Sequence, residues 1–173
     1  MVAAAVVFDS GLGVHPLIRD SKKLTSAQRE QMFDWIQQHA LAIGVGMASA
    51  GTVDRINVLQ ATMLAMSRAV LRLPERFLDV PMQVDGNRVP KSLQGRAIAV
   101  VHGDRLIPAI SAASIIAKVT RDRIMCALDA KFPVYGFAIH KGYGTERHRD
   151  AIRDFGPSLC HRRTFAPMKT TSA

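Results

Sequence analysis

The most regular feature of this sequence is a run of apolar residues spaced three and four apart between residues 53 and 70. An α-helix completes a turn in about 3.6 residues, so this spacing places them on one face of a long helix. The face contains Val53, Ile56, Leu59, Met63, Met66 and Val70. Pro74 follows just beyond, where it cannot continue the helix. A helix of this kind must pack against a second layer, and we interpret its methionines as core residues and not as ligands.

The rest of the chain alternates short strand-like and longer helical patterns. Short apolar runs predict strands over residues 2–8, 43–48, 81–84 and 97–101. Helices are predicted over residues 26–41, from Ser111 to before Pro133, and over 146–155. Thr25 and Gln28 have the spacing of a capping box at the start of the first helix. This order predicts an α/β fold in which helices flank a mixed sheet.

The connections limit how the strands can pair. The first two strands are expected to be antiparallel neighbours. The last two are joined by a segment too short to hold a crossover helix, so they need other partners or a long turn. A length of 173 residues suits one domain over residues 1–173.

Positive charge dominates the composition. Lys and Arg number 23 against 14 Asp and Glu, which gives a formal net charge of +9. A surface of this kind attracts polyanions such as nucleic acids, although a basic structural domain with no nucleic-acid role has the same composition. No apolar run reaches the roughly 18 residues of a membrane span, so no membrane partner is expected.

The cysteines and the N-terminal segment point to an intracellular protein. Cys126 and Cys160 are far apart and lack zinc-site spacing, so we expect two reduced thiols. The apolar run after Met1 has no basic lead-in and stops at Asp9, which favours a strand over an export signal. We therefore expect a cytoplasmic location.

Two aspartates follow predicted strands. Asp85 ends the third strand, and Asp104 follows the fourth strand after His102 and Gly103. Ligands of open α/β sheets bind beyond strand ends, so the two carboxylates are expected to converge. Carboxylate oxygens without imidazole or thiolate suit Mg²⁺ or Mn²⁺ better than zinc. The ordinary alternative for each aspartate alone is a turn residue beside glycine.

A series of motifs in order decides between these alternatives. The motifs occupy residues 20–24 (DSKKL), 57–63 (NVLQATM), 84–87 (VDGN), 103–104 (GD), 110–122 (ISAASIIAKVTRD), 135–143 (YGFAIHKGY) and 161–167 (HRRTFAP). The series resembles bacterial ribonuclease HII over essentially the whole chain.

The resemblance implies a fold, an activity and a metal requirement. The fold is a ribonuclease H-like mixed sheet flanked by helices, with a C-terminal helical extension. The activity is endonucleolytic cleavage of the RNA strand of RNA–DNA hybrids and incision at ribonucleotides embedded in duplex DNA, leaving 5′-phosphate and 3′-hydroxyl ends. Four carboxylates bind Mn²⁺ or Mg²⁺ in such a site, and Asp85 and Asp104 match the third and fourth of them, as catalytic residues and metal ligands.

The resemblance also indicates how nucleic acid is bound. Tyr143 matches the tyrosine that packs at the sugar of the ribonucleotide next to the DNA junction, and its neighbours favour an exposed ring over a buried core residue. Lys22, Lys23, Arg162 and Arg163 are expected to contact phosphates, although a solvated face is the ordinary role of a single basic residue. Lys118, Arg121 and Asp122 have helical spacing suited to salt bridges, a structural role.

The sequence departs from the family at its start. The family's opening strand, with an Asp-Glu pair and a Gly-Arg-Gly turn, would precede Val2, where only Met1 stands. Two of the four carboxylates are then missing, so the alternative function is a catalytically impaired remnant that still binds nucleic acid. We favour a misplaced start over a decayed copy, and expect open backbone edges on the neighbouring strands and a monomeric protein. Gly144 replaces the usual proline after Tyr143, which should loosen that loop.

Overall fold

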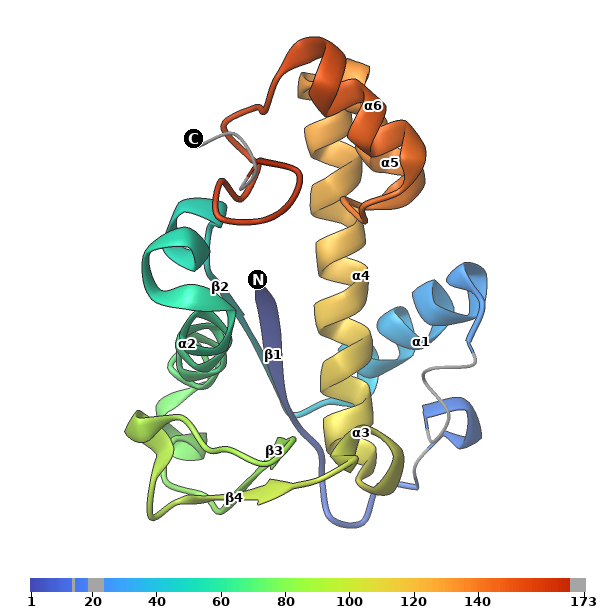
Figure 1. Cartoon of the computed structure of the whole chain (residues 1–173). Coiled ribbons are helices and arrows are strands. Elements are labelled where there is room, and N and C mark those ends of the chain that lie inside the picture. The colour runs from blue at the N-terminus through green and yellow to red at the C-terminus, as the bar shows by residue number, and fades with distance from the viewer. Residues whose placement is uncertain (14, 19–23, 169–173) are drawn as a thin grey trace.

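The structure of the protein is a computed structural model that describes residues 1–13, 15–18 and 24–168. The predicted α/β architecture is confirmed (Figure 1). The strands are β1 (Val2–Val7), β2 (Ala42–Met47), β3 (Met82–Asp85) and β4 (Ala97–Val100). The helices are α1 (Ser26–His39), α2 (Ala50–Val70), α3 (Gly103–Leu106), α4 (Pro108–Lys131), α5 (Phe137–His140) and α6 (Glu146–Phe155), with short 3-10 turns at Glu75–Phe77, Lys91–Leu93 and Pro133–Tyr135.

The first two strands form an antiparallel pair, as predicted. Val2 pairs with Met47 and Val7 with Ala42. Figure 1 shows this pair between α2 on one side and α4 with α1 on the other. The helix α2 lies directly on the backbone of β2, since a Cβ atom at Gly44 or Gly46 would lie 2.0 Å from a carbonyl oxygen of α2. Only glycine allows this close packing.

The last two strands pair with each other in parallel. Met82 pairs with Ala97 and Asp85 with Val100. Of the two arrangements left open by the sequence, the structure has the long turn, which contains the 3-10 turn Lys91–Leu93 in place of a crossover helix. Within the described residues the two strand pairs form separate sheets, so the mixed sheet is divided in two.

The helix α1 begins where its cap predicts. The Thr25 side chain accepts a hydrogen bond from the Gln28 N–H, and the Gln28 side chain accepts one from the Thr25 N–H. Met32, Phe33 and Ile36 then face the largest buried cluster, together with residues of α4. The capping box thus sets the start of a helix whose apolar face completes the main core.

The helices α2 and α4 differ from their predictions in detail. The backbone of Asn57 has φ 64° inside α2, and the Asn57 side chain accepts the N–H of Gln60, so the helix is kinked and capped again there. The helix α4 begins at Pro108, before the predicted start at Ser111, because proline fits the first turn of a helix. The buried Ser111 hydroxyl donates instead to the Ile18 carbonyl.

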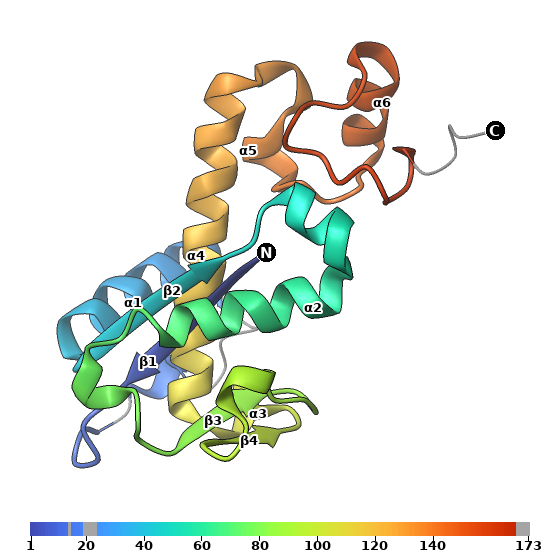
Figure 2. The same ribbon diagram turned by 90° about the vertical axis from the view of Figure 1, so that its left-hand side faces the viewer.

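The long helix α4 connects two parts of the fold. Its first half packs against β1, α1 and α3, and its second half packs against α5. Figure 2 shows α5 and α6 at the end of α4 that lies away from β3 and β4, so the predicted C-terminal helical extension is present. A separate cluster of Met125, Tyr135, Phe137, Ala151 and Ile152 forms its core. No helix in the described part of the chain has the length and apolar character needed to cross a membrane.

Candidate active site

The Asp85 carboxylate lies beside the backbone of Asp104, so the two predicted site residues are neighbours in the fold. Asp85 is the last residue of β3, and Asp104 lies in the first turn of α3. The backbone N–H of Asp104 lies 3.4 Å from Oδ1 of Asp85, a weak hydrogen bond between the two segments. Gly103 makes this approach possible, because a Cβ atom there would lie 2.6 Å from the Ile110 side chain and 3.4 Å from Asp85 Oδ1.

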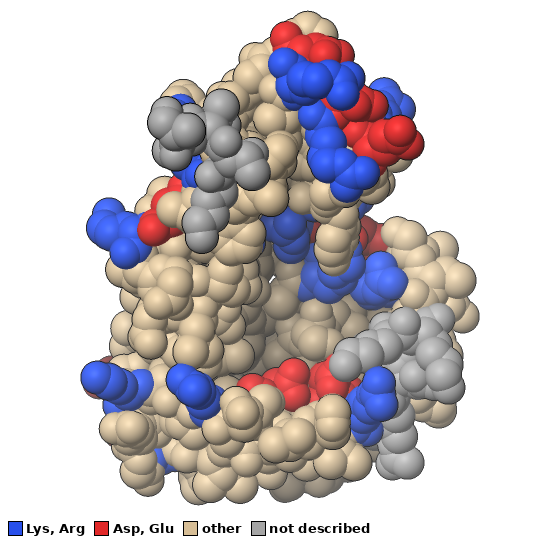
Figure 3. Space-filling model, in the orientation of Figure 1, with Lys and Arg blue, Asp and Glu red and all other residues tan. Residues whose placement is uncertain are grey.

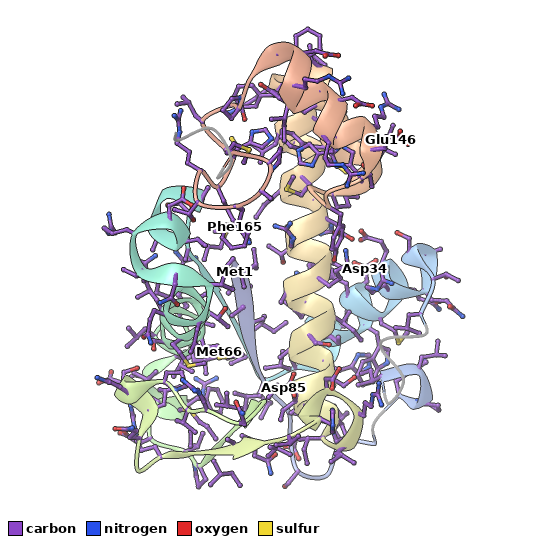
Figure 4. The ribbon with its side chains drawn as sticks, in the orientation of Figure 1. Met1, Asp34, Met66, Asp85, Glu146 and Phe165 are labelled. Atoms are coloured by element: carbon purple, nitrogen blue, oxygen red, sulfur yellow. The ribbon has the colours of Figure 1, made fainter. Side chains whose placement is uncertain are left out.

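The two carboxylates differ in exposure. Asp104 is only 5% exposed, whereas Asp85 is exposed to solvent. Figure 3 shows acidic side chains at the lower edge of a central hollow, and Figure 4 shows Asp85 at that place. A cavity of about 840 Å³ opens beside Asp85, between β1 and β3. The exposed Asp85 carboxylate at the edge of this cavity can be reached by a charged ligand.

The residues fit a hydrated divalent cation. Mg²⁺ commonly keeps several waters and binds through one or two carboxylates plus substrate phosphates. Asp85 and Asp104 provide such a pair of hard oxygen ligands. The described residues include no group of three or more His, Cys, Asp or Glu side chains that could hold a metal. The pair therefore fits an ion that shares its coordination with a phosphate, and does not form a complete protein cage.

Tyr143 lies in the loop between α5 and α6, and its side chain is 62% exposed. The expected exposed ring is thus found. The loop is attached to the second half of α4, where the Arg121 guanidinium donates to the Lys141 carbonyl at 3.1 Å. Ile110 packs on Gly103 near the carboxylates. It lies about 16 Å from Arg121 along α4, at a rise of 1.5 Å per residue. One rigid helix therefore holds both the carboxylate end and the tyrosine loop.

Three buried histidines support the tyrosine loop. The Ser158 N–H donates to Nδ1 of His161 at 3.0 Å, so the neutral His161 ring has its hydrogen on Nε2. This Nε2 lies 3.0 Å from Nε2 of His148, which must accept, and Nδ1 of His148 then donates to the Tyr143 carbonyl at 2.9 Å. A hydrogen-bond chain with fixed tautomers thus connects the C-terminal segment to Tyr143.

His140 adds a second support. The Gly142 N–H donates to its Nδ1 at 3.2 Å, so its Nε2 donates to the Tyr135 carbonyl at 2.6 Å. The ring of His140 also stacks on that of His148, with centroids 4.3 Å apart. Burial lowers the pKa of His148 and of His161 below the ordinary value of 6.5. The neutral rings on which this arrangement depends are therefore favoured.

The predicted basic residues fall into three groups. Lys22 and Lys23 lie outside the described residues. Arg162 is half-buried, and its pKa is lowered by burial and by the nearby Arg121 guanidinium. Arg163 is exposed, and its backbone N–H donates to Asp54 at 2.8 Å. The neighbouring guanidinium groups of Arg121 and Arg162 produce a positive potential that suits a phosphate.

The structural roles predicted on α4 are confirmed for Lys118 and Asp122. The Lys118 ammonium lies 2.5 Å from Asp122 Oδ1, an i,i+4 ion pair. His161 begins the motif at residues 161–167, but the sequence predicted no role for its side chain, for His148 or for Asp54. Asp54 accepts three hydrogen bonds from Arg163 and Thr164, which fix the start of the basic tail. Their irregular spacing along the chain gives no signal, because contacts distant in sequence bring them together.

Comparison with known proteins identifies the class. The chain matches a solved chain of the PCNA:RNase HII complex from Archaeoglobus fulgidus with TM-score 0.69 and 27% identity, over 90% of this chain and 78% of that one. It also matches the fold of ribonuclease H2 from Pyrococcus horikoshii, with TM-score 0.67 and 23% identity, over 98% and 96% of the two chains. The fold is therefore that of the ribonuclease H-like class of proteins.

Sequence relatives are more specific. The family model described as Ribonuclease HII matches residues 1–168. Ribonuclease HII of Burkholderia pseudomallei is 51% identical over 169 residues, which are 98% of this chain and 77% of the relative. The relative from Burkholderia vietnamiensis is 48% identical over 169 residues, 98% and 76% of the two chains. The chain belongs to the ribonuclease HII family, a family of endoribonucleases.

Proposed function

We propose that the protein hydrolyses the RNA strand of RNA–DNA hybrids and incises duplex DNA at embedded ribonucleotides, leaving 5′-phosphate and 3′-hydroxyl ends. The observation that carries the proposal is the convergence of Asp85 and Asp104 beside a cavity in a chain of this family. We further propose a monomeric cytoplasmic enzyme that requires Mn²⁺ or Mg²⁺.

We assign the two aspartates different roles because they differ in exposure to solvent. We assign Asp85 to the side of the site that would face the scissile phosphate, because it is exposed at the end of β3. Asp104, buried at the start of α3, provides a ligand whose position the surrounding protein holds. When bound, a divalent cation supplies charge neutralisation at the phosphate and a more acidic water. The reaction forms a bond from water oxygen to phosphorus, breaks the bond from phosphorus to O3′ and leaves a proton on O3′.

Recognition of the substrate uses the tyrosine loop, which is attached to the second half of α4, and the arginines of the C-terminal segment. The exposed ring of Tyr143 can pack against a sugar, and the 2′-hydroxyl distinguishes RNA from DNA. We propose that Arg162 and Arg163 contact phosphates, which would give affinity without sequence preference. The buried histidines act as positioning residues for this loop and have no role in bond breaking.

A second candidate function rests on the number of carboxylates. Among described residues only Asp85 and Asp104 form the site, and no third carboxylate, histidine or cysteine completes it. A protein that binds hybrids through its basic surface and Tyr143 without cutting them is consistent with this observation. This binding function and the nuclease function require different results in one assay.

The assay measures cutting and binding of one labelled substrate. The purified chain is incubated with a 5′-labelled RNA–DNA hybrid in Mn²⁺ or Mg²⁺, with excess EDTA as the metal-free control and an all-DNA duplex as the substrate control. The nuclease proposal expects cleavage of the RNA strand that EDTA abolishes. Salt-dependent binding without cleavage supports the binding function, and neither binding nor cleavage contradicts both.

A further inference from the structure

A second basic surface is formed by the end of α2 and by the connection between β3 and β4, over residues 68–96. Figure 3 shows Lys and Arg side chains over these segments, beside the acidic side chains at the lower edge of the hollow. Figures 1 and 2 both place β3 and β4 at one end of α4, and α5 with α6 at the other. The candidate site, at the end of β3, therefore lies between this surface and the tyrosine loop.

Most cations of this surface are not used in ion pairs. The basic residues are Arg68, Arg72, Arg76, Arg88, Lys91 and Arg96, and the acidic residues besides Asp85 are Glu75 and Asp79. Arg96 pairs with Asp79 at 3.0 Å, and the Arg76 guanidinium lies over the Phe77 ring. Among residues 1–13, 15–18 and 24–168, no ion pair includes any of the other four cations, which are all exposed. These four, Arg68, Arg72, Arg88 and Lys91, form a distal basic surface with a positive potential that a polyanion can neutralise.

Contacts between α2 and the β3–β4 connection bring these cations together. The Ser67 hydroxyl of α2 lies 2.7 Å from the Ser92 hydroxyl, a hydrogen bond between the helix and the 3-10 turn before β4. Arg68 and Lys91 are the residues next to this pair in the sequence. The Arg96 guanidinium donates to the Ser92 carbonyl at 3.3 Å and fixes the turn from its other side. The basic side chains therefore project from a backbone that is held in place.

The distal basic surface is within reach of a duplex that is bound at the carboxylates. Lys91 follows Asp85 by six residues, and an extended chain of that length spans at most about 21 Å. Each strand of duplex DNA has a phosphate about every 3.4 Å along the helix axis. The surface therefore meets backbone phosphates within about six base pairs of the carboxylates. Arg88 is closer still, because it follows Asp85 by only three residues.

We propose that Arg68, Arg72, Arg88 and Lys91 bind the backbone of the substrate duplex on the side of the cleavage point away from Tyr143. Phosphate contacts of this kind fix the register of a duplex and give affinity without sequence preference. The protein then holds its substrate on both sides of the site, through the tyrosine loop on one and the distal basic surface on the other. This inference rests on the proposed function for the identity of the ligand. It requires both binding and cutting to depend on duplex that extends over this surface.

A matched pair of lysines tests the surface by binding alone. Lys91→Glu reverses a charge of the distal basic surface, whereas Lys131→Glu reverses an exposed charge at the far end of α4. Binding of a labelled RNA–DNA hybrid of about 24 base pairs is measured by fluorescence anisotropy in EDTA, between about 50 and 200 mM salt. Lys91→Glu should bind on the order of tenfold more weakly at the lowest salt, with a salt slope smaller by about one. Lys131→Glu should bind within about twofold of the unaltered chain.

The outcomes separate this inference from the proposed function. Equal affinities and equal salt slopes in Lys91→Glu and Lys131→Glu overturn the inference, whether or not the unaltered chain cuts RNA. Weaker binding by Lys91→Glu in a chain that does not cut supports the inference together with the binding function, and contradicts the nuclease function. If Lys91→Glu does not fold, Arg72→Gln and Arg88→Gln make the same test at two other exposed positions of the surface.

Cleavage of shortened substrates tests which side of the site the surface serves. A DNA duplex with one ribonucleotide has arms of about 12 base pairs on both sides, and two further duplexes have one arm shortened to about three base pairs, too short to reach the surface. The kcat/KM of Lys91→Glu should be on the order of tenfold below that of the unaltered chain on the full duplex and on one shortened duplex, and equal to it on the other. Equal losses on both shortened duplexes overturn the proposed location. In a chain that does not cut, the binding comparison decides.

Discussion

Nε2 of His148 lies 3.0 Å from Nε2 of His161, and only one of these two atoms can have a hydrogen in that contact. The Ser158 N–H donates to Nδ1 of His161, and Nδ1 of His148 donates to the Tyr143 carbonyl. The hydrogen between the two rings therefore belongs to Nε2 of His161. Addition of a proton to either ring therefore breaks a hydrogen bond of the chain. The loop that holds Tyr143 is coupled in this way to the protonation of two buried side chains.

This coupling predicts a loss of stability in acid. The folded-state pKa values of His148 and His161 are below the ordinary 6.5, so the unfolded chain binds more protons in that range. The stabilisation is complete above pH 6.5 and is lost as pH falls through the lowered folded-state values. The measurement is the midpoint of urea unfolding between pH 5 and 8. His161→Ala should reduce the pH slope, whereas the exposed His39→Ala should leave it unchanged; equal slopes in all three proteins would refute the coupling.

A second prediction concerns the contact of α2 with β2. Gly46→Ala places a methyl group 2.0 Å from the Ala65 carbonyl, so either the helix or the strand must move. The free energy of unfolding should fall by about 3 kcal/mol or more, in the upper range for overpacking. Gly51→Ala is the matched control, because its Cβ atom meets nothing within 4 Å. Urea denaturation checks both, and a Gly46→Ala protein as stable as the control would show that the packing is looser than described.

The sequence predicts local features of this fold well. The stripe on α2 and the cap of α1 at Thr25 depend on residues within a few positions of each other, and both are found. The kink at Asn57 and the start of α4 at Pro108 were not predicted. Pro108 is a local signal for the start of a helix, but the prediction placed the start at Ser111. The φ of 64° at Asn57 has no such signal in the apolar spacing, which continues unbroken across it.

The candidate site could be predicted only in part. Asp85 and Asp104 were identified because each follows a strand, and Tyr143 because of the motif around it. The burial of Asp104 depends on the close packing of Gly103 on Ile110. The histidine chain depends on packing between α6 and the C-terminal segment, which no spacing in the sequence records. Contacts of this kind follow from the assembled fold and not from any single segment.

A third prediction concerns the tyrosine. Tyr143→Ala removes an exposed ring that we propose packs against the sugar at the RNA–DNA junction. The preference for cutting at a single ribonucleotide over a continuous hybrid should change by on the order of tenfold, the size expected for one aromatic contact. Phe155→Ala, which removes another exposed ring at 62% exposure, is the control. An unchanged preference in Tyr143→Ala would remove the proposed role in sugar recognition.

The most direct measurement is Mn²⁺ binding, followed by electron paramagnetic resonance in the presence of an RNA–DNA hybrid. The proteins are the unaltered chain, Asp85→Asn, Asp104→Asn and the exposed control Asp34→Asn. If Asp85 and Asp104 hold the cation, each of their variants should bind Mn²⁺ at least tenfold more weakly and lose RNA cleavage by on the order of 100-fold, while still binding the hybrid. Asp34→Asn should match the unaltered chain. Unchanged Mn²⁺ affinity in both Asp85→Asn and Asp104→Asn would contradict the account.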